Sequence, residues 1–415
     1  MHRSNKQLTS SLSFGVVELF AGAGGLASGF IRAGAYDVVA LTDIDKNARN
    51  TFLHNFPNTT YIQEDVINLT TEALQAAANG RTIHGLLGGP PCQGFSLAGR
   101  KDRHDHRNQY VTEYAKFVDT LNPFFLLMEN VPQVLFHQRF LALMQHLQVN
   151  YEVRAAVLNA ARYGVPQTRH RAFVLAYRRD LGIVPTFPAP THGFTGRDVY
   201  NYQLNKLERP GDNSALGGIF GADSITARRV SFAADFAEAK QLERPLMNVW
   251  EAIEDLSQPE WETNESDVLE LNMNCRGSLR SSDCPITNHR VRVHDQRMQR
   301  LMQLIKEGED LRVVQDKSLL PKSHYSQAYG RLHRQGLART ITTYFCNPGS
   351  GRFIHPTRNR AITVREAARL QSFEDEFEFL GTQAEQMRLV GNAVPPLLAE
   401  ALGRHVAQTL RSGSL

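Results

Sequence analysis

The first 180 residues alternate between short apolar runs and longer segments in which apolar residues recur at helical spacing. Apolar runs of this kind are typical of buried strands, and helical spacing is typical of helices. Strands are predicted at residues 16–20, 38–41, 61–62, 83–87, 124–128, 153–158 and 172–177. Helices are predicted from Asp45 onward, at 70–79 and from Tyr110 to Leu121. The alternation predicts an α/β fold with a mainly parallel sheet that is covered on both faces.

The pattern changes beyond residue 185. Three prolines, Pro185, Pro188 and Pro190, are followed by glycine-, serine- and charge-rich sequence without a clear period to about residue 290. We place a domain boundary near residue 187 and expect a smaller, irregular second domain, in which residues 292–306 are predicted to be a helix. A last helix is predicted at 395–410, because proline is favoured at the start of a helix.

Composition excludes several classes of protein. Apolar residues make up 42% of the 415 residues and charged residues 21%, which is ordinary for a globular chain and excludes extensive disorder. All apolar runs are far shorter than the about 20 residues of a membrane span, so no membrane association is expected. Four cysteines without a Cys-x-x-Cys pair predict neither a disulfide framework nor a structural zinc site. We therefore expect no metal, and a reducing cytoplasm as the location.

Charge is unevenly distributed along the chain. The net charge is only +4, but residues 331–369 contain eight arginines and a single acidic residue, Glu366. Such a stretch is typical of a phosphate-binding surface, and it is equally typical of a solvated basic face. Charge alone does not decide between the two.

A glycine-rich turn at residues 20–25 joins the first predicted strand to a helix. Glycine lets a backbone turn sharply and approach a ligand closely. Asp43 lies 21 residues after Gly22, at the end of the next strand, where a carboxylate can bind ribose hydroxyls, and Asp65 follows the third strand. These features predict a pocket for an adenosine-containing cofactor. An NAD-dependent dehydrogenase, whose glycine pattern Ala27 satisfies, and a tight turn without a ligand are the alternatives at this point.

The fourth predicted strand leads into a loop with a single cysteine, Gly-Gly-Pro-Pro-Cys92. The two prolines stiffen the backbone, and ligands of open parallel sheets bind beyond the carboxyl ends of the strands. Cys92 is therefore a candidate nucleophile, although a lone cysteine is more often an inert buried residue. The polar segment 97–108 that follows is a candidate lid. Glu129, at the end of the next strand, is a candidate general acid, with a solvated or helix-capping role as the alternative.

Arg169 and Arg171 stand two residues apart just before a predicted strand. Side chains two apart in an extended chain share a face. Two guanidinium groups on one face suit a carbonyl oxygen or a phosphate, and an ordinary surface pair is the alternative.

Taken together and in order, six segments of the chain resemble the motifs of the cytosine-5 DNA methyltransferases, in particular those of bacterial restriction-modification systems. The segments are FAGAGG at 20–25, GGPPCQGFS at 88–96, MENV at 128–131, QTRHR at 167–171, RAITVREAARLQSF at 360–373 and GNAVPP at 391–396. The resemblance extends from the first predicted strand to the last helix.

The resemblance implies a Rossmann-like, S-adenosylmethionine-dependent methyltransferase domain at 1–186 and a target-recognition domain at 187–362. A hinge at 363–390 and a C-terminal segment at 391–415, which returns to the first domain, complete the implied organisation. The implied cofactor is S-adenosylmethionine, and the implied binding residues are Phe20, Gly22, Gly24, Asp43, Ile44, Asp65, Val66, Pro90, Asn392 and Val394. Among these, Asp43 is expected to hold the ribose, and Ile44 is expected to lie on the adenine, where many relatives have an aromatic residue.

The resemblance also implies the reaction. Addition of the Cys92 thiolate to carbon 6 of cytosine makes carbon 5 nucleophilic enough to accept a methyl group. Glu129 is expected to bind or protonate ring nitrogen 3, and Arg171, with Arg169 nearby, to bind the exocyclic oxygen. The cytosine has to leave the base stack to be reached. Double-stranded DNA is therefore the implied substrate and partner. Two settings are consistent with the resemblance: a restriction-modification system, in which the protein is paired with a restriction endonuclease of the same specificity, and a solitary bacterial modification enzyme.

Two further hypotheses stay open at this stage. The first is the same chemistry on tRNA, but the relatives of that type usually depart from GGPPCQGFS and carry a Cys-Phe-Thr element, which this sequence lacks. The second is a DNA-binding module that has lost activity, and the intact Cys92, Glu129, Arg169 and Arg171 argue against it.

Overall fold

The computed structural model describes residues 13–91, 109–193, 230–231, 244–256, 259–261, 286–321 and 328–413. Cys92, the predicted lid at 97–108 and most of residues 194–285 lie outside these described residues.

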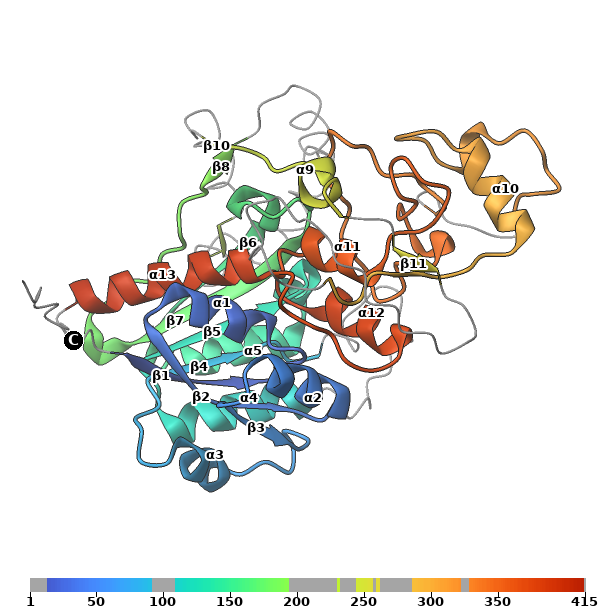
Figure 1. Ribbon diagram of the computed structural model, residues 1–415. Coiled ribbons are helices and arrows are strands. Elements are labelled where there is room, and N and C mark those ends of the chain that lie inside the picture. The colour runs from blue at the N-terminus through green and yellow to red at the C-terminus, as the bar shows by residue number, and fades with distance from the viewer. Residues whose placement is uncertain are drawn as a thin grey trace, which may run out of the picture.

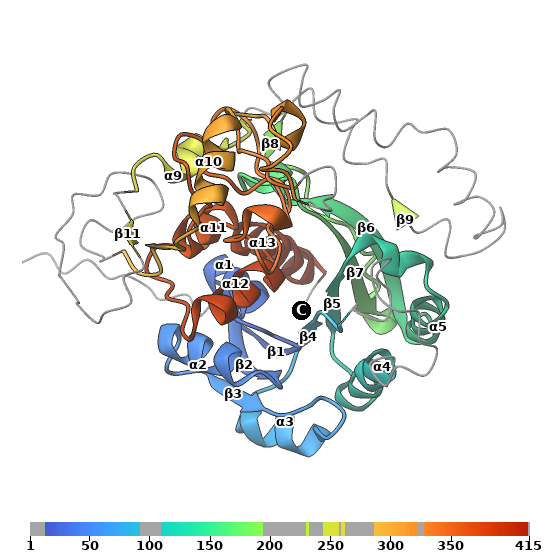
Figure 2. The same ribbon diagram turned by 90° about the vertical axis from the view of Figure 1, so that its right-hand side faces the viewer.

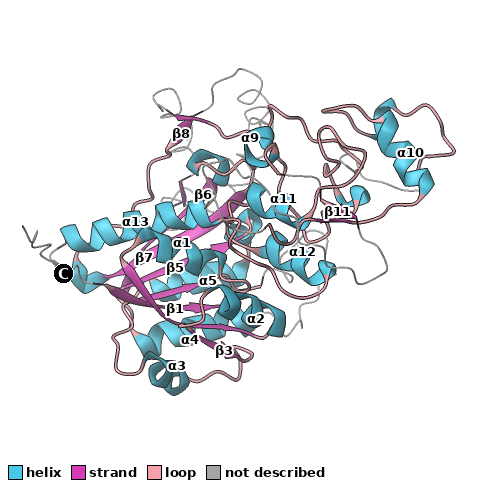
Figure 3. Ribbon diagram, in the orientation of Figure 1, coloured by secondary structure: helices cyan, strands magenta, loops and turns pink. Residues whose placement is uncertain are grey.

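A large sheet forms the centre of the described structure (Figures 1 and 3). Its strand order is β3-β2-β1-β4-β5-β7-β6-β9. Its strands are β1 (Phe14–Leu19), β2 (Tyr36–Asp43), β3 (Thr60–Gln63), β4 (Gly85–Gly88), β5 (Phe125–Asn130), β6 (Tyr151–Asn159), β7 (His170–Arg178) and β9 (Val230–Ser231). Strands β1 to β5 pair in parallel, and β7 runs antiparallel to both β5 and β6. The prediction of an α/β fold with a mainly parallel sheet is confirmed.

Helices connect the strands and continue into the C-terminal half. They are α1 (Gly25–Ala33), α2 (Lys46–Asn55), α3 (Thr71–Ala78), α4 (Gln109–Leu121), α5 (Gln138–Leu147), α9 (Val249–Ile253), α10 (Gln296–Leu304), α11 (Val364–Leu370), α12 (Gln383–Asn392) and α13 (Pro396–Ser412). Short 3-10 helices lie at Pro132–Phe136, Ala160–Tyr163, Arg179–Leu181, Leu311–Val313 and Pro348–Ser350. None of the helices in the described ranges combines the length and the apolar character that a membrane span requires.

Outside the large sheet, the described part of the chain contains two small strand pairs. They are β8 (His192–Gly193) with β10 (Arg244–Pro245), and β11 (Glu260–Trp261) with β12 (Arg290–Val291).

Side chains of the sheet alternate between two apolar clusters, because successive residues of a strand point to opposite faces. Val16 and Leu87 belong to the cluster on one face, and Val17 and Leu86 belong to the cluster on the other. Helices α1, α2 and α13 cover the first face, and α3, α4 and α5 cover the second (Figure 2). The sheet is therefore buried on both sides, as its continuous apolar runs predict.

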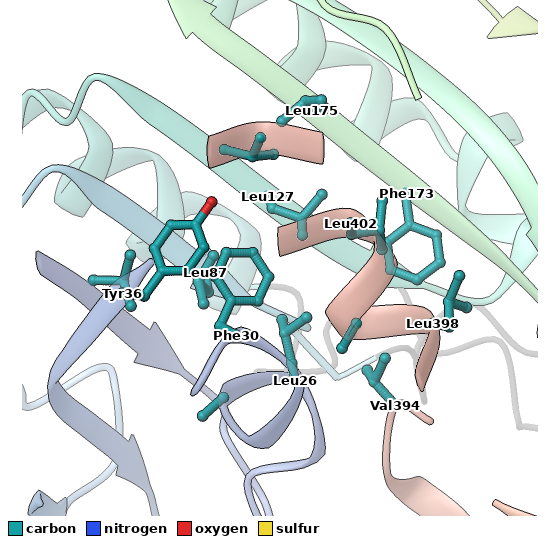
Figure 4. Close-up of a cluster of buried hydrophobic side chains, with 14 of the residues drawn as sticks. Leu26, Phe30, Tyr36, Leu87, Leu127, Phe173, Leu175, Val394, Leu398 and Leu402 are labelled. Atoms are coloured by element: carbon teal, nitrogen blue, oxygen red, sulfur yellow. The ribbon is translucent and has the colours of Figure 1, made fainter. Parts of the chain in front are cut away.

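The last helix, α13, packs directly on the first, α1. Leu26 and Phe30 of α1 and Leu398 and Leu402 of α13 lie in the same buried cluster over the sheet (Figure 4). Gly29 of α1 permits this contact, because a Cβ atom there would lie 2.3 Å from the Cβ atom of Ala399. Gly25 lets the segment before α13 approach, because a Cβ atom there would lie 2.3 Å from the carbonyl oxygen of Val394.

Another apolar cluster involves α9, α11, α12 and the irregular segment between residues 332 and 362. Ala23 and Ala48 from the N-terminal part of the chain also belong to this cluster, so it adjoins the turn after β1 and the first turn of α2. The division of the chain into domains at residues 186, 362 and 390 stays a prediction.

Half of the arginines in the basic stretch 331–369 are buried. Four of them, Arg331, Arg360, Arg365 and Arg369, are at most 6% exposed. They donate hydrogen bonds to backbone carbonyls or to buried carboxylates. Neither a phosphate-binding surface nor a solvated face describes these four side chains, whose charge stabilises loops in the interior.

Most predicted helices and strands within the described residues are present, with shifted ends. The helix predicted at 292–306 is shorter, because Asp295 caps α10 by accepting a hydrogen bond from the backbone of Met298 at 2.7 Å. Helix α5 was not predicted, although Phe140, Leu143 and Met144 recur on one face at helical spacing.

Candidate active site

A cleft of about 400 Å³ opens at the carboxyl ends of β1, β2 and β5, the edge at which open α/β sheets bind ligands. Segments from both ends of the chain line it. The predicted site residues in its lining are Phe20, Gly22, Asp43, Ile44, Asp65, Val66, Pro90, Glu129, Arg169, Arg171, Asn392 and Val394. Gly24 is not in the lining, and Cys92 lies outside the described residues.

The glycine turn after β1 is shaped by left-handed backbone conformations. Phe20 has φ 57°, Gly22 has φ 54° and Gly24 has φ 76°. A Cβ atom on Gly22 would meet nothing within 4 Å, which leaves the backbone open toward the cleft. Gly24 has a structural role, because a Cβ atom there would lie 2.2 Å from the ring of Phe52. A non-glycine residue in the left-handed region, such as Phe20, is a strained feature that is common at functional sites.

Asp43 is held in place by backbone donors on both of its oxygens. The N–H of Gly22 donates to Oδ2 and the N–H of Asp45 donates to Oδ1, each at 2.9 Å. Burial raises the pKa of Asp43, and these two N–H groups oppose that rise. A carboxylate oxygen can accept more than one hydrogen bond, so the fixed carboxylate can still bind hydroxyl groups in the cleft.

The neighbouring wall of the cleft is partly aromatic. Ile44 is 63% exposed, and Val66 is buried. Tyr110, at the start of α4, makes an edge contact with Phe20 at 5.4 Å between ring centroids, and its hydroxyl donates to Asp65 at 3.1 Å. The sequence predicted Tyr110 only as the first residue of a helix. Its position at the first turn after the predicted lid was the signal that it reaches the cleft.

Glu129 and Arg171 form an ion pair at the other side of the cleft. Nε of Arg171 lies 3.0 Å from Oε1 of Glu129, and both side chains are largely buried. The register explains the contact: Glu129 is opposite Phe173 in the β5–β7 ladder, and Arg171 precedes Phe173 by two residues on the same face. Burial raises the pKa of Glu129, and the guanidinium groups of Arg171 and then Arg169 oppose that rise.

Asn130 ties the loop before Cys92 to β5. Its side-chain amide donates to the carbonyl of Pro90 at 2.8 Å, in a buried position. A Cβ atom on Gly89 would lie 3.2 Å from a carboxylate oxygen of Glu129, so the loop backbone runs close to this acid. The loop backbone therefore passes Glu129 just before Cys92. Asn130, which fixes this loop, was not among the predicted site residues.

Glu18 is a second residue that the sequence did not single out. It lies on β1, is 3% exposed and lines the cleft. Its Oε2 atom has no hydrogen-bond partner among the described residues. Burial raises its pKa well above the ordinary value, against the effect of a hydrogen bond from the backbone of Ala27. A buried, incompletely satisfied carboxyl in a cleft indicates a ligand with a complementary donor.

Comparison with known proteins agrees with the geometry. Residues 14–408 match the family described as C-5 cytosine-specific DNA methylase. The type II methyltransferase M1.HphI of Haemophilus parahaemolyticus is 32% identical over 410 residues, which cover 97% of this chain and 89% of that protein. The type II methyltransferase M.XorII of Xanthomonas oryzae pv. oryzae is 32% identical over 409 residues, which cover 95% of this chain and 85% of that protein.

A solved structure shares the fold. It is described as a DNA modification methyltransferase encoded within a prophage of E. coli, and it superimposes with a TM-score of 0.69 at 24% identity, covering 96% of this chain and 100% of the other. The family match extends over nearly the whole chain, from β1 to α13, and two relatives exceed 30% identity over more than nine tenths of it. This chain therefore belongs to the C-5 cytosine-specific DNA methylase family.

Proposed function

We propose that this DNA methyltransferase binds S-adenosylmethionine in the cleft and transfers its methyl group to carbon 5 of a flipped-out cytosine through a covalent adduct with Cys92. The observation that supports this most directly is that Asp43, which suits a ribose, and the Glu129–Arg171 pair, which suits a pyrimidine, line the same cleft. Family membership supplies the reaction class.

The residues of the cleft fit the cofactor. Asp43 suits the ribose hydroxyls, and Asp65 and Val66 suit the edge of the adenine ring, with Ile44 as an apolar cover. The unpartnered carboxyl oxygen of Glu18 suits the ammonium group of the methionine part. When bound, the cofactor supplies an electrophilic methyl group.

Three side chains, those of Cys92, Glu129 and Arg171, act on the cytosine. The Cys92 thiolate adds to carbon 6 of cytosine, and Glu129 donates a proton or hydrogen bond to nitrogen 3, so that negative charge does not accumulate on the ring. Arg171 binds the exocyclic oxygen and orients Glu129 through the contact of its Nε with Oε1, which a protonated carboxyl keeps as a hydrogen bond. After carbon 5 has accepted the methyl group, a water molecule takes the proton from carbon 5, the C5–H electron pair re-forms the C5–C6 double bond, and Cys92 leaves as a thiolate. Glu129 takes back the proton that it gave to nitrogen 3, which restores the aromatic ring.

The raised pKa of Glu129 agrees with its proposed role. A carboxyl group whose pKa is raised by burial is protonated at higher pH than an exposed one, and a proton donor needs that form. Cytosine within a duplex is out of reach of such a site, so the base has to be flipped out, as methyltransferases on DNA do.

Duplex DNA is the proposed substrate, in a short specific sequence. The relatives M1.HphI and M.XorII are named type II methyltransferases, which supports a role in restriction-modification and a companion endonuclease of the same specificity. The cytoplasm stays the predicted location.

Bisulfite sequencing tests the reaction and the substrate together. The protein is expressed in a host that lacks 5-methylcytosine, next to the Cys92→Ser variant, and host DNA is sequenced after bisulfite conversion. Protection of the cytosine in one short sequence by the wild type alone is the expected result. Unprotected DNA from cells with folded, cofactor-binding protein would contradict the proposal, and the same treatment of host tRNA would then test the RNA hypothesis.

Cofactor binding is tested separately by thermal unfolding. S-adenosylmethionine is expected to raise the unfolding midpoint of both the wild type and Cys92→Ser, because a ligand that binds only the folded state stabilises it. NAD serves as the control and is expected to leave the midpoint unchanged. Stabilisation by NAD alone would favour the dehydrogenase hypothesis.

A further inference from the structure

Arg169 differs from Arg171 in what its guanidinium group binds. Nη1 donates to the carbonyl of Ile341 at 3.2 Å. Nη2 donates to the carbonyls of Gly391 and Ala393, both at 3.0 Å. The side chain is 1% exposed. Its terminal nitrogens are therefore bound to backbone oxygens of two segments that lie far away in the sequence.

The carbonyls that Arg169 binds flank a residue of the cofactor cleft. Asn392 stands between Gly391 and Ala393, and Asn392 and Val394 both line the cleft. Helix α12 ends at Asn392, and the last carbonyls of a helix have no partner within the helix. A cation at this end also interacts favourably with the helix dipole. Arg169 thus provides the donors and the charge that this helix end needs.

A buried glutamine supports the same segment. The amide of Gln371 donates to the carbonyl of Val390 at 2.8 Å. Its carbonyl oxygen accepts a hydrogen bond from Gln167 at 2.9 Å, and the carbonyl oxygen of Gln167 accepts one from the backbone of Ile341 at 2.9 Å. Both glutamines are completely buried. Residues 390–393 are therefore held by one connected hydrogen-bond network around Arg169.

We propose that Arg169 is a positioning residue for cofactor binding: its guanidinium group holds residues 391–394 in the wall of the cleft, next to the base-binding pair. The proposal rests on the proposed use of this cleft for S-adenosylmethionine. The two arginines of this short motif therefore have different roles. Arg171 acts on the base and on Glu129, whereas Arg169 acts through the backbone of the C-terminal segment.

Lysine at position 169 tests this division. Lysine carries the same charge on a single nitrogen, so it cannot reproduce donors that branch toward Ile341 on one side and toward Gly391 and Ala393 on the other. Arg169→Lys is expected to weaken binding of S-adenosylmethionine about tenfold, equivalent to about 1.4 kcal/mol. The Michaelis constant for DNA is expected to change less than the constant for the cofactor. Cofactor affinity is measured by titration calorimetry without DNA, so that turnover does not enter.

Two matched variants complete the experiment. Arg171→Lys is expected to lower kcat and to leave cofactor affinity as in the wild type. Arg365→Lys controls for the loss of a buried arginine, because Arg365 is also completely buried and binds backbone carbonyls of Thr287, Glu374 and Phe377, none of which lines the cleft. It is expected to lower the unfolding midpoint without changing cofactor affinity.

Gln371→Leu provides a second test that leaves every arginine in place. It removes the hydrogen bond to Val390 and is therefore also expected to weaken cofactor binding. If Arg169→Lys does not fold, the cofactor affinity of Gln371→Leu tests the proposal instead. Unchanged cofactor affinity in both variants would overturn the proposal, and so would an equal loss in Arg365→Lys. Absence of binding by the wild type would instead overturn the proposed function.

Discussion

Two arginines in one short motif, Arg169 and Arg171, have different environments because of partners that are remote in the sequence. The contact of Arg171 with Glu129 follows from the antiparallel register of β5 and β7. The partners of Arg169 come from residues more than 170 positions away. The arginine side chain has four rotatable bonds, so its conformation depends on which acceptors lie within reach. The residues next to Arg169 and Arg171 in the sequence do not show which acceptors those are.

A pH profile tests the role of Glu129. Because burial raises the pKa of this carboxyl and the proposed reaction needs its protonated form, kcat is expected to fall as pH rises through that pKa. Glu129→Gln is expected to lower kcat about 10²- to 10⁴-fold and to abolish this alkaline decline. Methyl transfer to DNA at saturating substrate, measured across pH, provides both readouts.

Glu152→Gln is the control for this experiment. Glu152 lies on β6 in a partly exposed ion pair with Arg179 and is not part of the cleft. Its rate and profile are expected to match the wild type. A Glu129→Gln enzyme that retained near-normal kcat, or the same alkaline decline, would refute the acid role.

Asp43→Ala tests the ribose site. Hydrogen bonds to a charged group contribute about 1.5–3 kcal/mol, so loss of this carboxylate is expected to weaken cofactor binding about 10- to 100-fold. Asp37→Ala, on the same strand but in an exposed pair with Arg81, is expected to bind the cofactor normally. Equal affinities of the two variants in titration calorimetry would remove Asp43 from the site.

At the scale of elements, sequence patterns predicted what depends on local periodicity. The strands of the N-terminal half and helix α3, with Thr70 as its N-cap, follow from apolar runs, helical spacing and capping residues. The buried role of Arg331, Arg360 and Arg365 in the basic stretch could not be predicted, because charge density does not show which cations satisfy interior carbonyls. Similarly, the contribution of Tyr110 to the cleft depends on how α4 is placed against β1.

The contact of α1 with α13 provides a prediction about stability. Valine at position 29 places new methyl groups where Ala399 already lies, so Gly29→Val is expected to cost about 1–3 kcal/mol through overpacking. Denaturant unfolding measures this cost. Ile31→Val, on the same helix, is the control and is expected to cost less. A Gly29→Val protein as stable as the wild type would show that α13 does not pack as described.

At the scale of the whole molecule, the cleft depends on both ends of the chain. Its walls combine β1 and β2 with residues 388–394, and α13 closes the apolar face over Leu26 and Phe30. The sequence predicted this closure only through the resemblance of GNAVPP to a family motif, because apolar periodicity in α13 does not indicate which face of the sheet it covers. The two residues that hold Asn392 in place, Arg169 and Gln371, are visible only once the chain is folded.

Removal of residues 391–415 tests whether the fold and the cleft depend on the C-terminal end of the chain. A chain that ends at residue 390 exposes the apolar surface beneath α13, so we expect it to aggregate or to lack a cooperative unfolding transition. A chain that ends at residue 412 keeps α13 and is expected to unfold and bind the cofactor like the full chain. Calorimetric unfolding compares them, and a cooperative transition in the shorter chain would disprove the requirement for α13.

The contribution of α13 also bears on how the enzyme is made. A nascent chain on the ribosome already contains the glycine turn, Cys92 and Glu129 long before Asn392 is synthesised. The cleft nevertheless lacks part of its lining until the segment 391–394 has emerged and has met Arg169. Under the proposed function, an interrupted translation product carries the proposed reactive residues and is expected not to modify DNA, so we expect methylation only from chains that have been synthesised through α13.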